Sequence, residues 1–278
     1  MKTLCIYHSD CIDGAAAAAV VVKKYPDIEL IPAKHGDPAP QNLEGKRVVI
    51  VDFSFSVETL TEMRSKAAEF LWFDHHKTAL PACQALGAGV IDLNESGATL
   101  TWKQLFPNTP VPQILQYVRD KDIWLWELPE SREVSADIRE TDDIYNPANP
   151  IWKKFLDGIS TEEFQAMVAR GKHSRRLLKD RLIGAGKRGF PITLDGHKGF
   201  AVNWTGDSSE LGEYIYQELK YPVAAIFSYD GKQWSFSLRS NTVDVSEIAV
   251  KRGGGGHAGA AGFRKETNDI LWLFETKT

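Results

Sequence analysis

The stretch FLWFDHHKT, residues 70–78, places a short apolar run directly before three polar residues. An apolar run of this length, bounded by polar residues, is typical of a strand buried in a sheet. Asp74, His75 and His76 follow the run, and their carboxylate and imidazole groups can bind metal ions or transfer protons. The stretch therefore predicts a buried strand whose end carries reactive groups.

Similar apolar runs recur through the first half of the chain, each followed by a stretch that favours a helix. A continuous apolar run suits a strand buried on both faces, and alternation with helices is typical of an α/β fold with a parallel sheet. The expected strands are LCIY (4–7), VVIV (48–51), FLWF (70–73) and AGVIDL (88–93). The expected helices lie within residues 14–25, 57–69 and 95–106.

The remainder of the chain changes character twice. Residues 111–189 predict mainly helices, one of them opened by a capping box of Ser160 and Glu163. Beyond them, GFAVNW, VAAIFSY and QWSFSLRS predict strands, with Asp230 and Gly231 as a hairpin turn, and helices follow Ser208 and Asp244. We therefore expect a parallel-sheet domain with a helical connector, residues 1–186, and a smaller α/β domain, residues 187–278.

Composition limits the classes of function. The 278 residues are 43% apolar and 25% charged, which is ordinary for a globular protein, and the net charge of −4 argues against a global field for duplex DNA. The three cysteines form no paired motif, which suits a cytoplasmic protein without a disulfide framework. No apolar run approaches the roughly 20 residues that cross a bilayer, and no signal peptide is recognisable, so no membrane partner is expected.

Acids and imidazoles also follow the first two expected strands. LCIY runs into His8, Asp10 and Asp13, and VVIV runs into Asp52. Because ligands of open parallel sheets bind beyond the carboxyl ends of the strands, these side chains should meet residues 74–76 at one edge. Mixed carboxylate and imidazole donors suit divalent ions such as manganese. So many donors predict two ions about 3.5–4 Å apart that share a carboxylate and activate water for attack on phosphorus.

A second motif lies in the last third, where KRGGGGHAGAAGF places Gly253–Gly256 between a helix and His257. A glycine loop lets backbone amides approach a phosphate closely, with His257 as a further donor. A flexible linker is the alternative. Arg239 ends an expected strand of the same domain and could clamp a phosphate, although an exposed structural arginine is equally compatible with its position.

The Asp-His-His triplet and the GGGGHAGAAG segment together resemble the DHH phosphoesterase superfamily, in the branch with the DHH-associated C-terminal domain. The chain is similar to oligoribonuclease-like and exopolyphosphatase-like members over nearly its whole length. The resemblance implies two α/β domains with an active-site cleft between them. It also implies two Mn²⁺ ions, replaceable by Mg²⁺ or Co²⁺, that serve the hydrolysis of phosphoester or phosphoanhydride bonds.

The same resemblance implies a role for each motif residue. Asp52 would bridge the two ions, and His75 would bind the second one. Asp74 would orient its neighbours, and His76 would face metal or substrate phosphate. One further acid is implied in YVRDKDIW, residues 117–124, where Asp120 is favoured over Asp122. The catalytic candidates are His76 and Asp74; the metal candidates are His8, Asp10, Asp13, Asp52, His75 and Asp120, with Cys11 and Asp122 as alternatives; the substrate-binding candidates are Arg239, Ser240, Gly254, Gly255, Gly256 and His257.

The first motif departs from the family pattern, which is usually a histidine followed by two acids one residue apart. Here Asp10 and Asp13 are separated by two residues, and Cys11 occupies the place of the earlier acid when counted back from Asp13. Three alternatives stay open: Asp10 reaches the metal, Cys11 binds it, or the metal is weakly held. A thiolate would shift the metal preference towards zinc.

The leading expectation is a cytoplasmic, Mn²⁺-dependent phosphodiesterase that converts short oligonucleotides or linear dinucleotides to nucleoside monophosphates. The enzymatic alternatives are a cyclic-dinucleotide phosphodiesterase, a 3′-phosphoadenosine phosphate phosphatase and an exopolyphosphatase. A nucleotide-binding regulator with disabled catalysis is the alternative from a different class. Trp124, Trp126 and Trp152 could stack on bases or pack in the core. Analogy with similar members makes a homodimer a further expectation.

Overall fold

The structure is a computed structural model that describes residues 1–34 and 36–266. The chain divides into two compact units, Met1–Arg175 and Arg176–Thr278. The division falls inside helix α8 (Thr161–Gly186), whereas the sequence predicts a boundary at the end of that helix. The last turns of α8 group with the second unit because Leu182 and Ala185 are buried in a core of that unit.

The first unit contains a five-stranded sheet in the order β2-β1-β3-β4-β5, and all its neighbouring strands are parallel. This confirms the α/β fold predicted from the alternating apolar runs. Strand β2 was not expected, because Pro32 interrupts its pattern; an edge strand tolerates proline since one side of its backbone has no neighbouring strand. The strands are β1 (Thr3–His8), β2 (Ile28–Ala33), β3 (Arg47–Val51), β4 (Glu69–Asp74) and β5 (Val90–Ile91).

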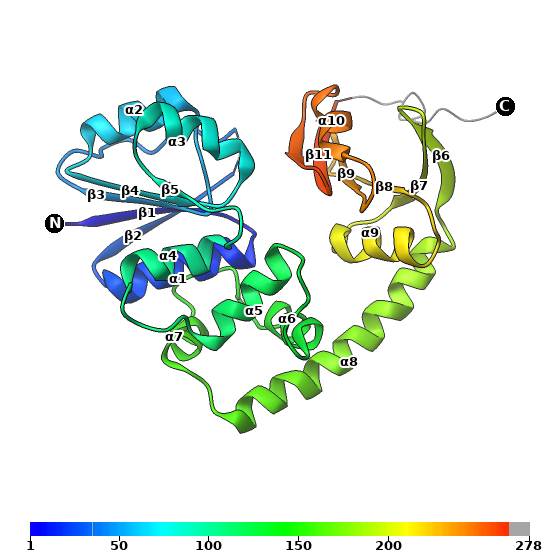
Figure 1. Ribbon diagram of the computed structural model, residues 1–278, viewed down its shortest axis with the longest axis horizontal. Coiled ribbons are helices and arrows are strands. Elements are labelled where there is room, and N and C mark those ends of the chain that lie inside the picture. Colours follow the sequence, from blue (N-terminus) through cyan, green and yellow to red (C-terminus); the bar gives the residue numbers. More distant parts are fainter. Residues whose placement is uncertain (35, 267–278) are drawn as a thin grey trace. The chain divides into compact units, whose positions relative to one another are not determined.

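Helices cover both faces of this sheet (Figure 1). Alternate residues of β1 enter the two cores: Cys5 packs with α1 and α4, whereas Leu4 packs with α2 and α3. Burial on both faces is the reason why these strands read as unbroken apolar runs. The helices are α1 (Ile12–Lys24), α2 (Val57–Lys66), α3 (Leu80–Leu86) and α4 (Gly97–Leu105), with a 3-10 turn η1 (Lys77–Ala79) before α3.

Helices continue the first unit beyond the sheet, as predicted for residues 111–189. They are α5 (Gln113–Asp122), α6 (Ser131–Arg139), α7 (Pro150–Asp157) and α8. The predicted capping box opens α8: the backbone N–H of Ser160 donates to Glu163 Oε2, and the N–H of Glu163 donates to Ser160 Oγ, both at 3.1 Å. Trp152 is a core residue, because it is buried and its Nε1 donates to the carbonyl oxygen of Ile144 at 2.9 Å.

The second unit is a smaller α/β unit with a six-stranded sheet in the order β10-β11-β9-β8-β7-β6. Strands β7 and β8 pair in parallel and the other neighbours pair antiparallel. This unit has two hydrophobic cores. Helix α9 and the end of α8 pack in one of them, and α10 packs in the other. The elements are β6 (Phe190–Leu194), β7 (His197–Asn203), α9 (Ser208–Gln217), β8 (Val223–Tyr229), β9 (Trp234–Arg239), α10 (Val245–Val250), β10 (Gly255–His257) and β11 (Ala260–Lys265).

The predicted helices and strands of this unit are confirmed, and β6, β10 and β11 are additions. The hairpin turn is also confirmed, because Asp230 Oδ1 accepts from the N–H groups of Lys232 and Gln233. The cap of α9 lies one residue earlier than expected, at Asp207, whose Oδ1 accepts from Ser209 N.

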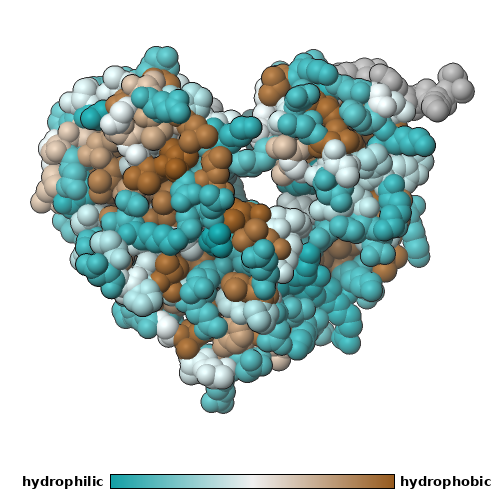
Figure 2. Space-filling view, in the orientation of Figure 1, coloured by the Kyte–Doolittle hydropathy of each residue, from teal (hydrophilic) through white to brown (hydrophobic). Residues whose placement is uncertain are grey.

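Hydrophobic residues gather on the visible face of the first unit around β5 (Figure 2). A shallow pocket of about 390 Å³ lies at this edge of the sheet and is lined partly by Phe70, Leu71 and Val90. In the part of the chain that the structure describes, no helix is both long and apolar enough to cross a bilayer.

Candidate metal centre

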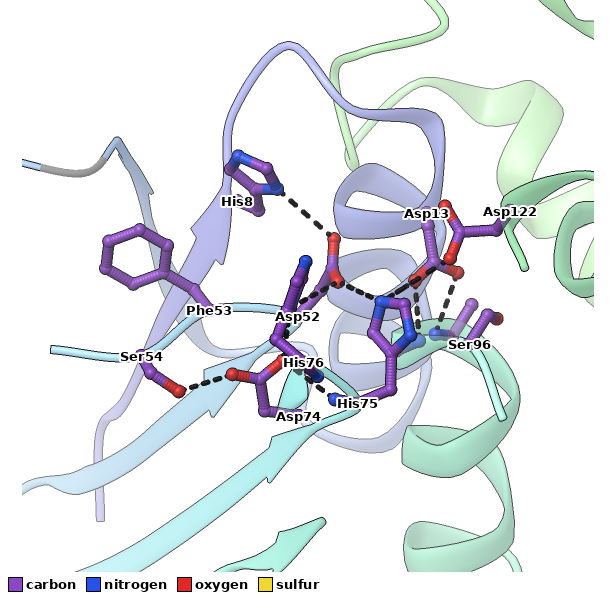
Figure 3. A network of polar contacts seen from close by, with 12 residues as sticks. His8, Asp13, Asp52, Phe53, Ser54, Asp74, His75, His76, Ser96 and Asp122 are labelled. Atoms are coloured by element: carbon purple, nitrogen blue, oxygen red, sulfur yellow. Dashed lines mark hydrogen bonds and ion pairs between the residues drawn. The ribbon is translucent and has the colours of Figure 1, made fainter. Parts of the chain in front are cut away.

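The candidate site lies at the carboxyl ends of three neighbouring strands of the first unit (Figure 3). His8 is the last residue of β1, Asp52 follows β3, and Asp74 ends β4. The parallel register places Tyr7 beside Val51 and Val51 beside Phe73, so the three strands end at the same level. Asp52 has a φ of +53°, a left-handed conformation that aspartate adopts more readily than most residues.

Three groups of donor atoms meet at this edge, and the atoms of each group lie within 4.8 Å of one another. Asp52 and His75 each belong to two of the groups, so the three groups form one continuous cluster. The groups are His8, Cys11 and Asp52; Asp52, His75 and His76; and Asp13, His75 and Asp122.

His75 lies at the centre of three carboxylates. Its Nε2 is 3.1 Å from Asp52 Oδ1, 3.4 Å from Asp122 Oδ2 and 3.9 Å from Asp13 Oδ2. On the other side of Asp52, Oδ2 lies 3.6 Å from His8 Nδ1. Asp52 therefore contacts imidazoles through both of its oxygens, as a bridging carboxylate would.

Asp74 holds the two histidines that follow it. Its Oδ1 accepts from the backbone N–H of His75 at 2.7 Å and of His76 at 3.2 Å, and it lies 2.6 Å from His76 Nδ1. Ser54 Oγ donates to the other oxygen. These contacts suit the orienting role that the family resemblance implies for Asp74.

The N-terminus of α4 holds Asp13. The N–H groups of Gly97 and Ala98 donate to the two oxygens of Asp13 at 2.5 and 3.0 Å. A capping box between Ser96 and Thr99 opens this helix. The positive end of a helix stabilises an anion, so α4 favours a charged carboxylate at this position.

Burial and neighbouring charges shift the pKa values of the site residues in different directions. Burial, together with the nearby Asp122 and Asp52, raises the pKa of Asp13 well above its usual value. Burial would also raise the pKa of Asp52, but its contacts with His75 and His8 lower it. In spite of burial, the contact with Asp52 raises the pKa of His75 to about 10. The crowded carboxylates therefore repel one another, and a bound cation would relieve that repulsion.

Two buried oxygens show that the residues present fit a bound metal. Asp52 Oδ2 and Asp122 Oδ2 have no hydrogen-bond partner among the described residues. A buried carboxylate oxygen without a donor is unfavourable unless a cation satisfies it. Oxygen, imidazole and thiol donors are those that borderline divalent ions prefer.

Two predicted ligands lie outside the cluster. The Asp10 carboxylate is 72% exposed and pairs with Lys34 Nζ at 2.5 Å. Asp120 instead accepts from the N–H groups of Glu127 and Leu128 and so orders the segment after α5. Asp122, the less favoured alternative, joins the cluster, because residues two apart on a helix point in different directions.

The substrate-binding candidates of the second unit have clear local roles. Arg239 Nε donates to Ser209 Oγ at 3.2 Å, and burial lowers the pKa of its guanidinium. Ser240 Oγ donates to the carbonyl oxygen of Pro222 at 2.7 Å and accepts from the N–H of Val243 at 2.9 Å. Ser240 therefore supports a turn beside Arg239.

The glycine motif forms a turn and a strand, where a loop was expected. Gly255, Gly256 and His257 make up β10, which pairs with β11. A Cβ at Gly254 would collide with the backbone of Gly262, and Gly256 has a φ of +139°. The close approach of two backbone segments thus explains these two glycines, whereas His257 is exposed at the end of β10.

Known proteins resemble this chain in sequence and in fold. The family model described as DHHA1 domain matches residues 200–271. Oligoribonuclease NrnB of Bacillus subtilis is 26% identical over 246 residues, which are 78% of this chain and 58% of that protein. These matches support the DHH superfamily, with a DHHA1 domain in the second unit. An uncharacterized protein, R106 of Acanthamoeba polyphaga mimivirus, is 24% identical over 284 residues and covers 92% of the chain. The chain spans 66% and 58% of the lengths of these two relatives.

Solved structures share the DHH fold along nearly the whole chain. The pGpG-specific phosphodiesterase PggH of Vibrio cholerae has a TM-score of 0.53 at 15% identity and covers 98% of this chain and 96% of that one. An exopolyphosphatase-related protein of Bacteroides fragilis has a TM-score of 0.50 at 12% identity and covers 98% and 88% of the two chains. At these identities the likeness concerns the fold.

Some residues of the candidate site were not identified from the sequence. Ser54, Gly97 and Ala98 contact the candidate ligands, yet they carry no side chain that binds metal. The Ser96–Thr99 capping pattern was a usable signal for Gly97 and Ala98, because it marks a helix N-terminus directly after an expected strand. Ser54 offered no comparable signal.

Trp124 and Trp126 follow Asp122 by two and four residues, and both are half-buried. Both adopt left-handed φ angles, +60° and +58°, and their rings meet edge to face at 4.9 Å. Their packing differs from that of Trp152, which is a core residue.

Proposed function

We propose that this DHH-superfamily chain is a metal-dependent phosphoesterase that hydrolyses short oligonucleotides or linear dinucleotides to nucleoside monophosphates. The sharing of Asp52 and His75 among three donor groups carries the proposal, because a shared carboxylate suits two neighbouring ions. A nucleotide substrate is supported by the relative named oligoribonuclease and by the fold shared with a pGpG-specific phosphodiesterase.

Two divalent ions are the proposed cofactors, with Mn²⁺ in at least one of the two positions. Asp13, His75 and Asp122 would hold one ion, His8 and Asp52 would hold the other, and Asp52 would be shared. When bound, such ions supply Lewis-acid chemistry: they polarise phosphoryl oxygens and allow water to attack at neutral pH.

The chain's own residues position the reacting groups. Asp74 holds the His76 ring by Nδ1, and its negative charge raises the pKa of His76 although burial lowers it. A protonated His76 would donate a hydrogen bond to a phosphate oxygen and stabilise developing charge. We further propose that Arg239 and His257 of the DHHA1 domain bind a phosphate group of the substrate.

The test is hydrolysis of 5′-phosphorylated di- to pentanucleotides with added Mn²⁺, followed as release of nucleoside monophosphate. Asp122→Asn and His75→Ala should each lose activity by more than about 100-fold, because even an outer partner of a metal ligand contributes about 10–100-fold. Asp10→Asn is the matched comparison: its carboxylate faces solvent, so activity should stay within about twofold of the parent chain.

The outcome separates the alternatives. Monophosphate release that Asp10→Asn abolishes and Asp122→Asn leaves intact would contradict the proposed ligands. Turnover of a cyclic dinucleotide, 3′-phosphoadenosine phosphate or polyphosphate in place of the oligonucleotides would replace the substrate class. Nucleotide binding without turnover of any of them would support a regulator. The cytoplasmic location and the homodimer stay predictions.

A further inference from the structure

Cys11 lies in the candidate metal centre, between β1 and α1, where the first motif departs from the family pattern. It is the N-cap residue of α1, but its side chain makes no capping hydrogen bond. Its sulfur, a ring nitrogen of His8 and a carboxylate oxygen of Asp52 lie within 4.8 Å of one another. The position of Cys11 is therefore that of a donor, and helix capping does not explain it.

Asp52 supplies a second and independent observation. The residue is 1% exposed, and its Oδ2 has no hydrogen-bond partner among residues 1–34 and 36–266. The same oxygen lies 3.6 Å from His8 Nδ1. A buried carboxylate oxygen of this kind points to a cation on the side of Asp52 that faces His8.

Asp10, the competing donor in the first motif, is directed elsewhere. It adopts a left-handed φ of +54° in the turn after β1, and its carboxylate pairs with Lys34 at the surface. With Asp10 turned outward, Cys11 is the residue between His8 and Asp13 that joins a donor group.

We propose that Cys11 binds, as a thiolate, the ion held by His8 and Asp52. The proposal deepens the proposed function and rests on its metal centre. When the ion binds, the S–H bond breaks, the proton passes to solvent, and a sulfur–metal bond forms. A thiolate beside imidazole and carboxylate selects Zn²⁺ or Co²⁺ over Mn²⁺. The neighbouring position has no sulfur donor among the described residues, so the two ions should differ in preference.

The test is a Co²⁺ titration of the full chain, read by absorption. A cobalt–thiolate bond produces a near-ultraviolet charge-transfer band, while Co²⁺ held by protein ligands at a low coordination number produces visible bands stronger than those of aqueous Co²⁺. The parent chain should show both. Cys11→Ser should lose the near-ultraviolet band and keep visible bands from the second position. Cys83→Ser is the matched control and should keep both, because Cys83 lies outside the three donor groups and its thiol contacts the carbonyl oxygen of Gly89.

The outcomes distinguish this inference from the proposed function. Visible bands without a thiolate band in the parent chain would overturn the role of Cys11 and leave the metal centre standing. A thiolate band that survives in Cys11→Ser would also overturn it. A parent chain that binds no cobalt would overturn the metal centre and the role of Cys11 together.

A second variant tests selectivity without relying on a lost signal. Cys11→Asp restores the usual acidic donor, so the chain should shift from Zn²⁺ towards Mn²⁺ when both ions compete and retained metal is measured by mass spectrometry. The Zn²⁺ affinity should fall by at least about 10–100-fold, the loss that accompanies even an outer partner of a ligand. If Cys11→Asp retained Zn²⁺ and Mn²⁺ in the same ratio as the parent chain, the result would contradict the inference.

Discussion

Gly14 and Gly97 bring the backbone directly against the candidate ligands. A Cβ on Gly14 would collide with the carbonyl oxygen of His8. A Cβ on Gly97 would lie 2.5 Å from Asp52 Cβ and 2.9 Å from Asp13 Oδ2. Since the N–H of Gly97 also donates to Asp13, a larger residue there would move a ligand and its hydrogen-bond donor together.

Gly97→Ala should therefore weaken metal binding by at least about tenfold, in the range that follows the loss of a partner of a ligand. Cobalt titration of the variant measures this change. Gly184→Ala is the control, because a Cβ there meets no atom within 4 Å and α8 should gain up to about 1 kcal/mol in unfolding free energy. Equal cobalt affinity in the two variants would mean that the site tolerates a side chain at position 97.

The sequence predicted the location of those candidate residues whose direction is set by the sheet. Asp52 and His75 could be located because parallel strands must end at one edge. The directions of Asp10 and Asp120 could not be predicted. A left-handed turn directs the Asp10 side chain outward, and the helical rotation of α5 separates the Asp120 side chain from that of Asp122. Such directions depend on backbone angles that residue types alone do not determine.

At the scale of elements, an ion pair ties the β6–β7 turn to the end of α10. Asp195 lies in this turn and contacts Arg252 Nη2 at 2.5 Å and Lys251 Nζ at 3.1 Å. Asp195 and Arg252 are both partly buried, with side chains 18% exposed. The contact with Arg252, and to a smaller extent the contact with Lys251, lowers the pKa of Asp195, although burial raises it.

Asp195→Asn should destabilise the second unit by about 1 kcal/mol or less at pH 7. A carboxyl whose pKa is lowered by folding stabilises the protein above its unfolded pKa of about 3.9, and this contribution disappears as the pH falls through the folded value. The difference between parent and variant should thus vanish in strongly acidic solution. Urea unfolding at pH 7 and at lower pH measures it, and a difference independent of pH would exclude the ion pair as its cause.

Elements with long apolar runs or clear caps were predictable, and short or interrupted ones were not. Strand β2 was missed because of Pro32, which an edge strand accommodates. Strand β10 was missed because glycines weaken a strand pattern; only its pairing with β11 gives them a role. In both strands, pairing with a distant segment outweighs local preference.

At the scale of the whole molecule, each unit has cores of its own. Leu115 is fully buried in a core of the first unit, and Leu211 is fully buried in a core of the second. The sequence indicated two domains through its change of pattern after the helical region. It did not indicate that α8 would contribute Leu182 to the second unit's core, because a long helix carries no internal mark of a boundary.

Leu115→Ala and Leu211→Ala form a matched pair that tests this organisation. Each should cost about 2–5 kcal/mol of unfolding free energy in its own unit. Cobalt absorption during thermal unfolding should therefore be lost at a lower temperature in Leu115→Ala and at the parent temperature in Leu211→Ala. An equal decrease of that temperature in both variants would show that the two units unfold as one.

Every candidate ligand of the metal centre lies between residues 8 and 122, so the first unit alone contains the complete donor set. Synthesis proceeds from the N-terminus, and N-terminal domains generally fold first. The candidate donor set can therefore come together on the nascent chain before the DHHA1 domain has been translated.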